Sequence, residues 1–466
     1  MMYAEWSNKL KIQNPTRDLL AWCDSELRLP NPDFYKKQAM GKWTGGTPEF
    51  INLYERVGSD IYLPFGCTKD VYLAFKSEIS LKPIYSPIRR VDYKSDIDLY
   101  SYQEAAVEAA VASKNGIIVM PCGAGKTQTA LELIARIGGR TLWLTHTQDL
   151  LNQSLNRAKS VLGILSNTYG TITGGKVNIG SGITFATVQT MAKIDLINYK
   201  DTFDVVVVDE CHKAVGSPTR VMQFYKVLSN LSCRYKFGLT ATPKRADGLE
   251  KSMFALLGGI VYEVSWEDVA GTTCPVQVET ISTGYVPNME VILAGDGTLN
   301  YSALIDDMTH DIGRMDIVID VIHKVAQDAN GYTFVLANRV EYLEQINNWL
   351  AKSNMKSICL STLGNSKAAK AVRKEALRKL NCGEIDVVLA TYQLAKEGLD
   401  VPNLRYVVFA TPEKDETTVM QAAGRVGRKA DGKDFGTVID FVDDFGMLKG
   451  WAKKRKGYYK KLGYNC

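Results

Sequence analysis

The fold is decided by residues 116–127, which read GIIVMPCGAGKT. A short apolar run breaks there into a glycine-rich turn, and helical periodicity follows from Thr129 to Ile137. A strand that leads through glycines into a helix presents backbone N–H groups and a positive helix end to phosphates. The order predicts a nucleoside triphosphate site, with Lys126 on the β- and γ-phosphates and Thr127 on Mg²⁺. The eight-residue pattern wants Gly where Met120 stands, so a plain turn remains the alternative.

A second apolar run, residues 203–208, is mostly β-branched, which is typical of a strand buried on both faces of a parallel sheet. It ends in Asp209 and Glu210. An α/β sheet places its chemistry at the carboxyl ends of its strands. Asp209 is suited to hold Mg²⁺ and Glu210 to orient or deprotonate an attacking water. An acidic pair is often only a helix cap, but the phosphate loop upstream favours catalysis.

The run Asp209-Glu210-Cys211-His212 resembles the DExH box of superfamily 2 helicases and translocases. The resemblance covers about four-fifths of the chain, from Asp96 onward, with the motifs in family order. It implies an α/β fold with two RecA-like domains in tandem, parallel sheets with flanking helices, and ATP and Mg²⁺ as cofactors. His212, Thr240 and Thr242 would couple ATP hydrolysis to movement along nucleic acid.

Residues 421–428, QAAGRVGR, resemble the arginine-finger motif of the second motor domain. A guanidinium there would stabilise charge that develops on the γ-phosphoryl oxygens. Arg428 is the first choice for the finger and Arg425 the second, and Gln421 completes the motif. The family often carries a further Arg where this chain has Ala422.

Residues 99–103 resemble the segment that touches adenine, with Gln103 on the base edge. The family often has Arg where Tyr100 stands, so the Tyr100 ring either stacks on adenine or the contact is missing. The other residues implied to bind nucleotide are Gly123, Gly125, Gly398 and Asp400, and a turn before Pro402 is the alternative for Asp400. The residues implied to contact a nucleic-acid strand are Thr145, Thr173, Gly174, Gly175, Thr187, Gln189, Arg339 and Thr391, each of which could instead be a cap or a turn.

A length of 466 residues allows about three domains. We expect an N-terminal accessory module over 1–95, motor domains over 96–272 and 273–447, and a basic aromatic tail over 448–466. The module carries no ATPase motif but holds 14 of the 44 aromatic residues, which indicates a folded α+β unit. It could recognise DNA, although an aromatic core explains the rings as well.

The tail is the electrostatic outlier, because seven Lys and Arg and no acid lie between Gly446 and Cys466. It could attract phosphates and stack bases, or it could be a solvated helix packed on the second motor domain. Between the motors, Met289 to Tyr301 predicts a hairpin around residues 295–297. Such a hairpin could be a strand-separating wedge or an ordinary linker.

Composition excludes other classes. No stretch approaches the roughly 18 apolar residues of a membrane span, and the N-terminus lacks a signal-peptide pattern. We therefore expect a soluble, cytoplasmic, monomeric protein, in the host cytoplasm if phage-encoded. Nine scattered cysteines without a Cys-x-x-Cys pair argue against zinc and disulfides. The net charge of +5 is modest for a nucleic-acid partner.

The pattern from Asn31 to Gly66, with residues 244–248, resembles the Rad25/XPB and phage UvsW branch of the superfamily. It implies an ATP-dependent DNA helicase or translocase that remodels branched DNA in recombination, repair or replication restart, alongside proteins of those processes. The alternatives are a duplex translocase or RNA helicase with the same motor, and an ATP-gated nucleic-acid clamp with vestigial hydrolysis. The complete set of Lys126, Asp209, Glu210 and Arg428 argues against the clamp.

Overall fold

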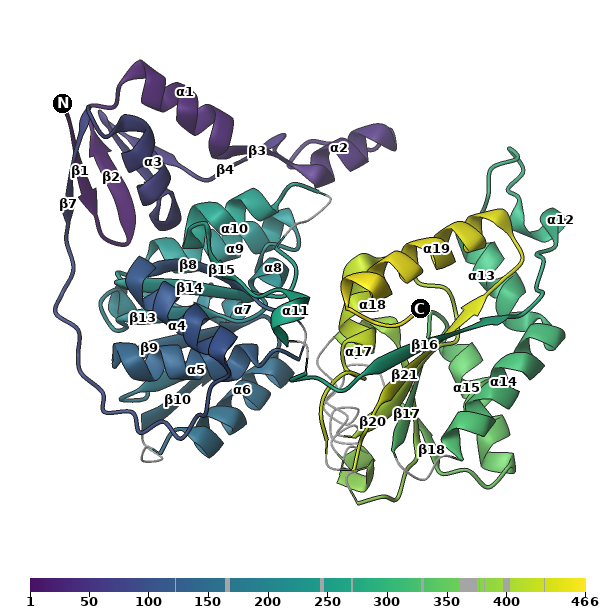
Figure 1. Cartoon of the computed structure of the whole chain (residues 1–466). Helices are drawn as coiled ribbons and strands as arrows, with labels where there is room; N and C mark the ends of the chain where they lie inside the picture. Colours follow the sequence, from purple (N-terminus) through teal and green to yellow (C-terminus); the bar gives the residue numbers. More distant parts are fainter. Residues whose placement is uncertain are drawn as a thin grey trace. The chain divides into compact units, whose positions relative to one another are not determined.

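The computed structural model describes residues 1–121, 123–163, 168–243, 247–269, 271–327, 331–360, 375–376, 378–380, 382–396, 403–430 and 432–466. The chain forms two compact units (Figure 1). The first consists of Met1–Pro121 with Gly125–Ser265, and the second is mainly Trp266–Cys466. The front module expected over 1–95 is thus part of the first unit.

An eight-stranded sheet forms the centre of the first unit, in the order β11-β10-β12-β9-β13-β14-β8-β15. Every neighbouring pair is parallel except β10 and β11. The two apolar runs of the sequence are β8 and β13, which both lie inside the sheet and are almost wholly buried, as continuous apolar strands require. The strands are β8 (Asn115–Val119), β9 (Thr141–Thr145), β10 (Tyr169–Thr173), β11 (Lys176–Asn178), β12 (Ile183–Thr187), β13 (Val205–Val208), β14 (Tyr235–Thr240) and β15 (Ile260–Glu263).

Helices flank this sheet and begin at the caps expected of them. Thr147 accepts a hydrogen bond from Leu150 N at the start of α6, and Ser217 accepts one from Arg220 N at the start of α9. The helices are α4 (Ser101–Ser113), α5 (Lys126–Ile137), α6 (Gln148–Val161), α7 (Val188–Met191), α8 (Cys211–Ala214), α9 (Pro218–Ser229) and α10 (Glu250–Leu257), with the short 3-10 helix η3 (Leu196–Tyr199).

The front module has its own five-stranded sheet, β5-β6-β2-β1-β7, in which only β1 and β7 run parallel. Its apolar core is continuous with that of the motor sheet. At Gly66 a side chain would lie 2.3 Å from Gly258 N, so the two parts touch backbone to backbone. The elements are β1 (Met2–Trp6), β2 (Lys9–Gln13), α1 (Arg17–Glu26), β3 (Arg28–Pro30), α2 (Pro32–Ala39), β4 (Phe50–Asn52), β5 (Glu55–Val57), β6 (Asp60–Pro64), η1 (Phe65–Cys67), α3 (Thr68–Phe75) and β7 (Ile79–Pro83).

The second unit contains a six-stranded parallel sheet in the order β16-β21-β20-β17-β19-β18. The sequence also predicts helices over 316–326, 341–351 and 368–380 between the strands of this unit. The first two lie inside α14 and α15, whereas most of the third lies outside the described residues. The elements are α11 (Trp266–Val269), β16 (Val276–Ser282), α12 (Met289–Ile292), α13 (Tyr301–His310), α14 (Ile312–Ala326), β17 (Tyr332–Ala337), α15 (Val340–Lys352), β18 (Ser357–Cys359), β19 (Val387–Thr391), α17 (Tyr392–Lys396), β20 (Leu404–Phe409), α18 (Glu416–Ala423), β21 (Gly436–Val442) and α19 (Gly446–Lys461).

The hairpin expected over 289–301 is wrong in its first half, which is the helix α12. Asn288 caps this helix by accepting from Glu290 N, and that cap stabilises helix over strand. The turn is as expected: Leu293 and Leu299 form an antiparallel bridge across it, and Ala294 N donates to Thr298 O at 2.8 Å.

The basic tail is the helix α19, which packs on the second sheet through buried Leu448, Trp451, Arg455 and Tyr459. Beyond it, Asn465 exchanges hydrogen bonds with the backbone of β16. The tail is therefore a helix packed on the second motor domain, and phosphate binding by its exposed lysines stays a prediction. Among the described residues, no helix has both the length and the apolarity to span a membrane.

Candidate nucleotide and nucleic-acid site

The carboxyl edge of the first sheet gathers the sequence-predicted catalytic residues. The neighbouring strands β9, β13, β14 and β8 end at Thr145, Asp209, Thr240 and the phosphate loop, respectively. Parallel strands bring their carboxyl ends to one edge, which is where ligands bind in such sheets. Motifs that are up to about a hundred residues apart in the chain therefore meet.

The phosphate loop has the backbone that its glycines were expected to supply. Gly123 and Gly125 have φ angles of +90° and +81°, a region that residues with side chains avoid. A side chain at Gly125 would also lie 2.3 Å from the Gln103 amide nitrogen. The helix α5 begins at the next residue, Lys126. The turn fits a triphosphate, because its two glycines leave the backbone accessible and the N-terminus of α5 offers N–H groups and a positive dipole end.

Gln103 links the expected adenine segment to this loop. Its side chain is buried, and its carbonyl oxygen accepts a hydrogen bond of 3.0 Å from Tyr100 N. Tyr100 is 49% exposed, and its ring stacks on Tyr102 with the centroids 5.6 Å apart. The segment thus combines a buried Gln103 next to the loop with an exposed Tyr100 ring.

Lys126 lies between the loop and the acidic pair. Its ammonium is 3.7 Å from a Glu210 carboxylate oxygen and donates to Met120 O at 3.5 Å. Asp209 is 7% exposed, and Ser154 donates to it at 3.5 Å. The sequence analysis missed Ser154, which is an ordinary helix residue by pattern.

The two carboxyls differ in electrostatics. Burial, reinforced by the charge of Glu210, raises the pKa of the Asp209 carboxyl above its usual range. Burial acts on Glu210 in the same direction, but Lys126, His212 and Lys213 outweigh it and lower the pKa of Glu210. Glu210 therefore holds its negative charge, whereas Asp209 gains from a nearby cation. This donor set, with the Thr127 hydroxyl, fits Mg²⁺.

His212 and the two threonines form one chain of hydrogen bonds. The Thr240 hydroxyl donates to Thr242 O at 3.1 Å and accepts from Thr242 N at 3.0 Å. His212 Nδ1 lies 2.8 Å from the same hydroxyl and 3.4 Å from a Glu210 oxygen. Since the single hydroxyl proton goes to Thr242, the imidazole Nδ1–H is the donor to Thr240. A movement of the Thr240–Thr242 turn would therefore shift His212 and change its contact with Glu210.

Several of the expected strand-contacting residues shape turns at this edge. Gly174 and Gly175, with φ angles of +57° and +78°, form the tight turn between β10 and β11. Thr173 at its base donates to the Gln148 side chain at 2.6 Å. Gln148 was not singled out from the sequence, because nothing local connects it to the hairpin.

The other three of this group lie close by. Thr187 caps α7 by accepting from Thr190 N, and Gln189 donates to His146 O at 3.2 Å. Thr145 is fully buried and donates to Thr147 O at 2.9 Å, so its hydroxyl holds the turn. Contacts from the Thr145–Thr147 turn to a nucleic-acid strand would therefore come from the backbone of the turn and from neighbouring side chains, not from the Thr145 hydroxyl.

In the second unit the finger candidates differ in exposure. Arg425 is buried and donates to Ala395 O, while Arg428 is exposed just beyond α18. Gln421 is buried in the last turn of that helix. The Arg428 side chain is therefore exposed to solvent, whereas Arg425 is engaged inside its own domain.

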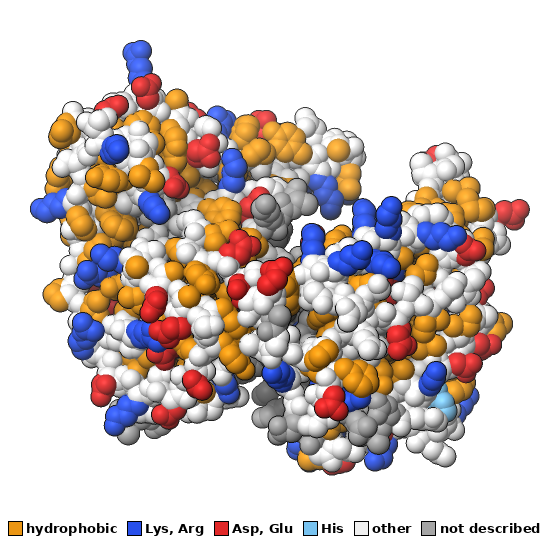
Figure 2. All heavy atoms as spheres, viewed as in Figure 1, with side chains coloured by type: hydrophobic (Ala, Val, Ile, Leu, Met, Phe, Trp, Pro, Cys, Tyr) orange, Lys and Arg blue, Asp and Glu red, His pale blue; other side chains and the backbone are white. Residues whose placement is uncertain are grey.

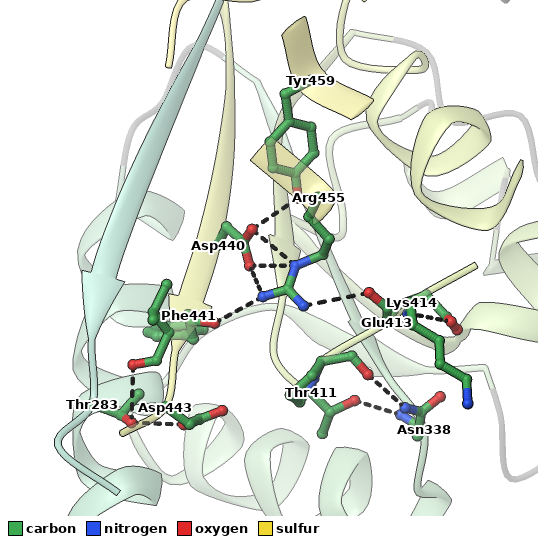
Figure 3. A network of polar contacts seen from close by, with 12 residues as sticks. Thr283, Asn338, Thr411, Glu413, Lys414, Asp440, Phe441, Asp443, Arg455 and Tyr459 are labelled. Carbon is green, nitrogen blue, oxygen red and sulfur yellow. Dashed lines mark hydrogen bonds and ion pairs between the residues drawn. The ribbon is translucent and has the colours of Figure 1, made fainter. Parts of the chain in front are cut away.

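A buried polar network holds the segment that leads into α18 (Figure 3). Arg455 of α19 pairs with Asp440 of β21 at 2.7 Å and donates to Glu413 O at 3.3 Å. Asn338 donates from its backbone to the Thr411 hydroxyl at 2.8 Å and from its side chain to Pro412 O. At the other end of α18, the Tyr464 hydroxyl donates to Ala423 O at 3.1 Å. The helix α18, which leads to the finger candidates, is thus held at both ends.

Two family models match this chain: the res subunit of type III restriction enzymes over residues 96–245, and the helicase conserved C-terminal domain over residues 313–430. Together they cover β8 to β14 of the first sheet, β17 to β20 of the second, and the motifs from Tyr100 to Arg428. This chain is a superfamily 2 helicase of the Rad25/XPB-like branch. It carries the two motor domains of a nucleic-acid-dependent ATPase.

The relatives of this helicase come from archaea, bacteria and viruses. A DNA 3′-5′ translocase, XPB2 of Sulfurisphaera tokodaii, is 28% identical over 72% of this chain and 80% of its own length. A mimivirus protein named as an RNA helicase is 27% identical over 75% of this chain, which spans 64% of that relative.

Solved structures confirm the tandem RecA-like fold. Yeast Dbp5 bound to RNA matches 78% of this helicase and 88% of its own chain, at 16% identity and a TM-score of 0.57. The Hef helicase domain of Pyrococcus furiosus matches 76% of this helicase and 97% of its own chain, at 21% identity and a TM-score of 0.50.

Lys433 is a residue of this helicase that the sequence analysis missed. Its buried ammonium donates to Val426 O at 2.5 Å and to Arg428 O at 2.8 Å, so it holds the backbone of the finger turn. Burial lowers the pKa of Lys433 to about 8. By sequence it is one lysine among many, and only the fold brings it under Arg428.

The remaining expected residues have mixed outcomes. Arg339 pairs with Asp306 at 2.6 Å and donates to Ser302, which ties β17 to α13. Thr391 accepts from Leu394 N at the start of α17. Gly398, Asp400 and residues 244–246 of the branch motif lie outside the described residues.

Proposed function

We propose that this chain is an ATP-dependent DNA helicase or translocase that remodels branched DNA. The observation that carries the proposal is the convergence of Lys126, Asp209 and Glu210 at one sheet edge, with an exposed Arg428 on a braced helix end. A chain that only clamped nucleic acid would need no carboxylate charged beside the phosphate loop.

Each residue has a role in hydrolysis under this proposal. Lys126 would leave Glu210 for the β- and γ-phosphates, and Glu210 would then hold and deprotonate the attacking water. Thr127 and Asp209 would hold Mg²⁺, which neutralises phosphate charge when bound. Arg428 would stabilise the charge that develops on the transferred group. Thr240, Thr242 and His212 would relay the change at Glu210 to the strand-contacting turns.

DNA as the substrate is supported by the relatives whose names specify DNA translocases and helicases of the XPB and Rad25 type. The branched-DNA role rests on the resemblance of the front module to the UvsW branch. An RNA helicase is the second candidate, because the mimivirus relative carries that name.

A matched substrate panel tests the proposal. ATP hydrolysis and strand displacement are measured with single-stranded DNA, duplex, fork, four-way junction and RNA of equal length. We expect strands to be displaced faster from forks and junctions than from the plain duplex. We also expect forks and junctions to stimulate ATP hydrolysis more than the other substrates do. Stimulation by RNA alone would establish the second candidate, and ATPase activity that no nucleic acid stimulates would contradict both.

A further inference from the structure

A groove lies within the first unit, between the front module and the motor domain. Its volume is about 1010 Å³. One wall comes from α2, the turn after it and β4, and the other from the start of α9 and the segment after α7. None of the nucleotide-binding, catalytic or strand-contacting residues assigned above contributes to the lining, so the groove is distinct from the nucleotide site and from the strand-contacting turns.

The charge of the lining is strongly one-sided. It holds five lysines and a single acid, Asp33; the lysines are Lys36, Lys37, Lys42, Lys193 and Lys226. Lys37 donates to the Thr47 hydroxyl at 2.6 Å, and Lys226 donates to Ala192 O at 2.8 Å. Lys36, Lys42 and Lys193 are exposed and form no ion pair with any residue that the structure describes. The N-terminal end of α9, at Pro218 and Thr219, adds its positive dipole end to the same wall.

Lysines of this kind fit phosphates better than bases. They are flexible point charges without fixed donor geometry, which suits sequence-independent backbone contacts. Phe50 is the one aromatic residue of the lining, and Arg28 lies over its ring at 4.1 Å from the centroid. The groove therefore offers little platform for stacking unpaired bases, on which single-strand binding depends.

We propose that this groove binds the sugar–phosphate backbone of a duplex DNA arm. A duplex presents one negative charge per roughly 1.7 Å of its axis, so it supplies more phosphate to a row of lysines than a single strand does. The motor would hold one strand of a branch while the groove holds an adjoining arm, which deepens the proposed function and rests on it. The module would thereby supply a preference for branched substrates.

The test is the triple reversal Lys36→Glu, Lys42→Glu and Lys193→Glu in the full-length chain. The matched control is Lys69→Glu, Lys76→Glu and Lys94→Glu, which changes the net charge equally at exposed lysines outside the groove. Binding of a blunt duplex, a fork and a single strand is measured against salt concentration without ATP. Circular dichroism checks that each variant is folded.

We expect the groove variant to bind the duplex and the fork more weakly, with a slope of log affinity against log salt that is flatter by roughly 2 to 3. Single-strand binding and single-strand-stimulated ATPase should stay within about twofold of wild type. Equal losses in both triple variants would mean that only net charge matters, and a loss confined to the single strand would make the groove a single-strand site. Either result, or an unchanged duplex slope, overturns the proposal.

The duplex titration also separates this proposal from the proposed function. A wild-type protein whose ATPase responds to no nucleic acid would contradict the helicase function, while a flattened duplex slope in the groove variant would still establish the groove. Conversely, normal fork remodelling with an unchanged duplex slope would contradict the groove alone.

Discussion

Glu210 combines a lowered pKa with a position beside Lys126, so it is the residue on which hydrolysis should depend most directly. We expect Glu210→Gln to lower ATP turnover by about 10²–10⁴, the usual contribution of a positioned base. Nucleotide affinity should change little, because Lys126 and Asp209 remain. Single-turnover hydrolysis and fluorescent-nucleotide binding measure the two quantities, with the exposed Glu108→Gln of α4 as the control. Turnover near the wild-type rate would sink the assignment.

The two finger candidates, Arg428 and Arg425, can be told apart by experiment because they differ in burial. Arg428→Ala should reduce turnover by about 10³–10⁵, as the loss of a finger does elsewhere, while thermal stability stays near that of wild type. Arg425→Ala removes a buried donor from Ala395 O, so it should lower the melting temperature as well as the activity. Steady-state ATPase and thermal melting are measured on both variants. If Arg425→Ala loses turnover at normal stability while Arg428→Ala stays active, Arg425 is the finger and the two roles are reversed.

At the scale of the element, α19 divides its basic residues between two tasks. Figure 2 shows Lys and Arg side chains gathered over this helix. Lys453, Lys454, Lys456 and Lys460 are exposed, whereas Arg455 is buried against Asp440. Reversing those four lysines to Glu should flatten the salt slope of DNA binding by roughly 2 to 3, with basal ATPase unchanged.

Arg455→Ala should behave in the opposite way. Breaking a buried ion pair costs about 3–5 kcal/mol of unfolding free energy, so the variant should melt early although its surface is nearly unaltered. Denaturant titration and DNA binding are compared for the two variants. If the lysine variant keeps the wild-type slope while folded, the helix is purely structural. Truncation after residue 449 cannot test DNA binding, because it removes Arg455 and the strand-like contact of Asn465.

At the scale of the whole molecule, the front module and the first motor domain share one apolar core. We therefore expect deletion of residues 1–95 to expose buried surface and to leave an insoluble or unfolded protein, rather than a motor without branch preference. Circular dichroism and sedimentation measure the outcome. A soluble, cooperatively melting motor would contradict it. For this reason the groove is tested by point reversals in the full chain.

Lys236 lies at the boundary between the front module and the first motor domain, and its burial makes the free energy of unfolding depend on pH. Its ammonium donates to Leu228 O at 2.7 Å and to Asn8 O at 3.4 Å, and burial lowers its pKa from 10.5 to about 8. The unfolded chain keeps this proton up to about pH 10.5, so it binds more protons than the folded chain between pH 8 and 10.5. Relative to Lys236→Met, the unfolding free energy should rise over that window by on the order of 3 kcal/mol. Denaturant titrations at pH 7.5 and 10 measure it, and a flat difference would contradict the shift.

The catalytic elements could be predicted from the sequence because they are local. A glycine loop between a strand and a helix, or two carboxylates at the end of a β-branched strand, carry their geometry in consecutive residues. Parallel strands then bring those ends together whatever the rest of the chain does. The same locality misled at 289–292, where an apolar segment predicted a strand, although the Asn288 cap favours a helix.

The tertiary structure alone decided the roles that depend on distant partners. Seven basic residues near the C-terminus look alike by sequence, yet Arg455 is a buried ion-pair partner and its neighbours are solvated. Lys236 at the module boundary carries no local signal either, because its partner Asn8 is 228 residues away in the sequence. The reason is physical: the burial and charge environment of a side chain are set by residues dozens to hundreds of positions away, which no pattern along the chain encodes. The lysine groove, with walls about 150 residues apart in sequence, is of the same kind.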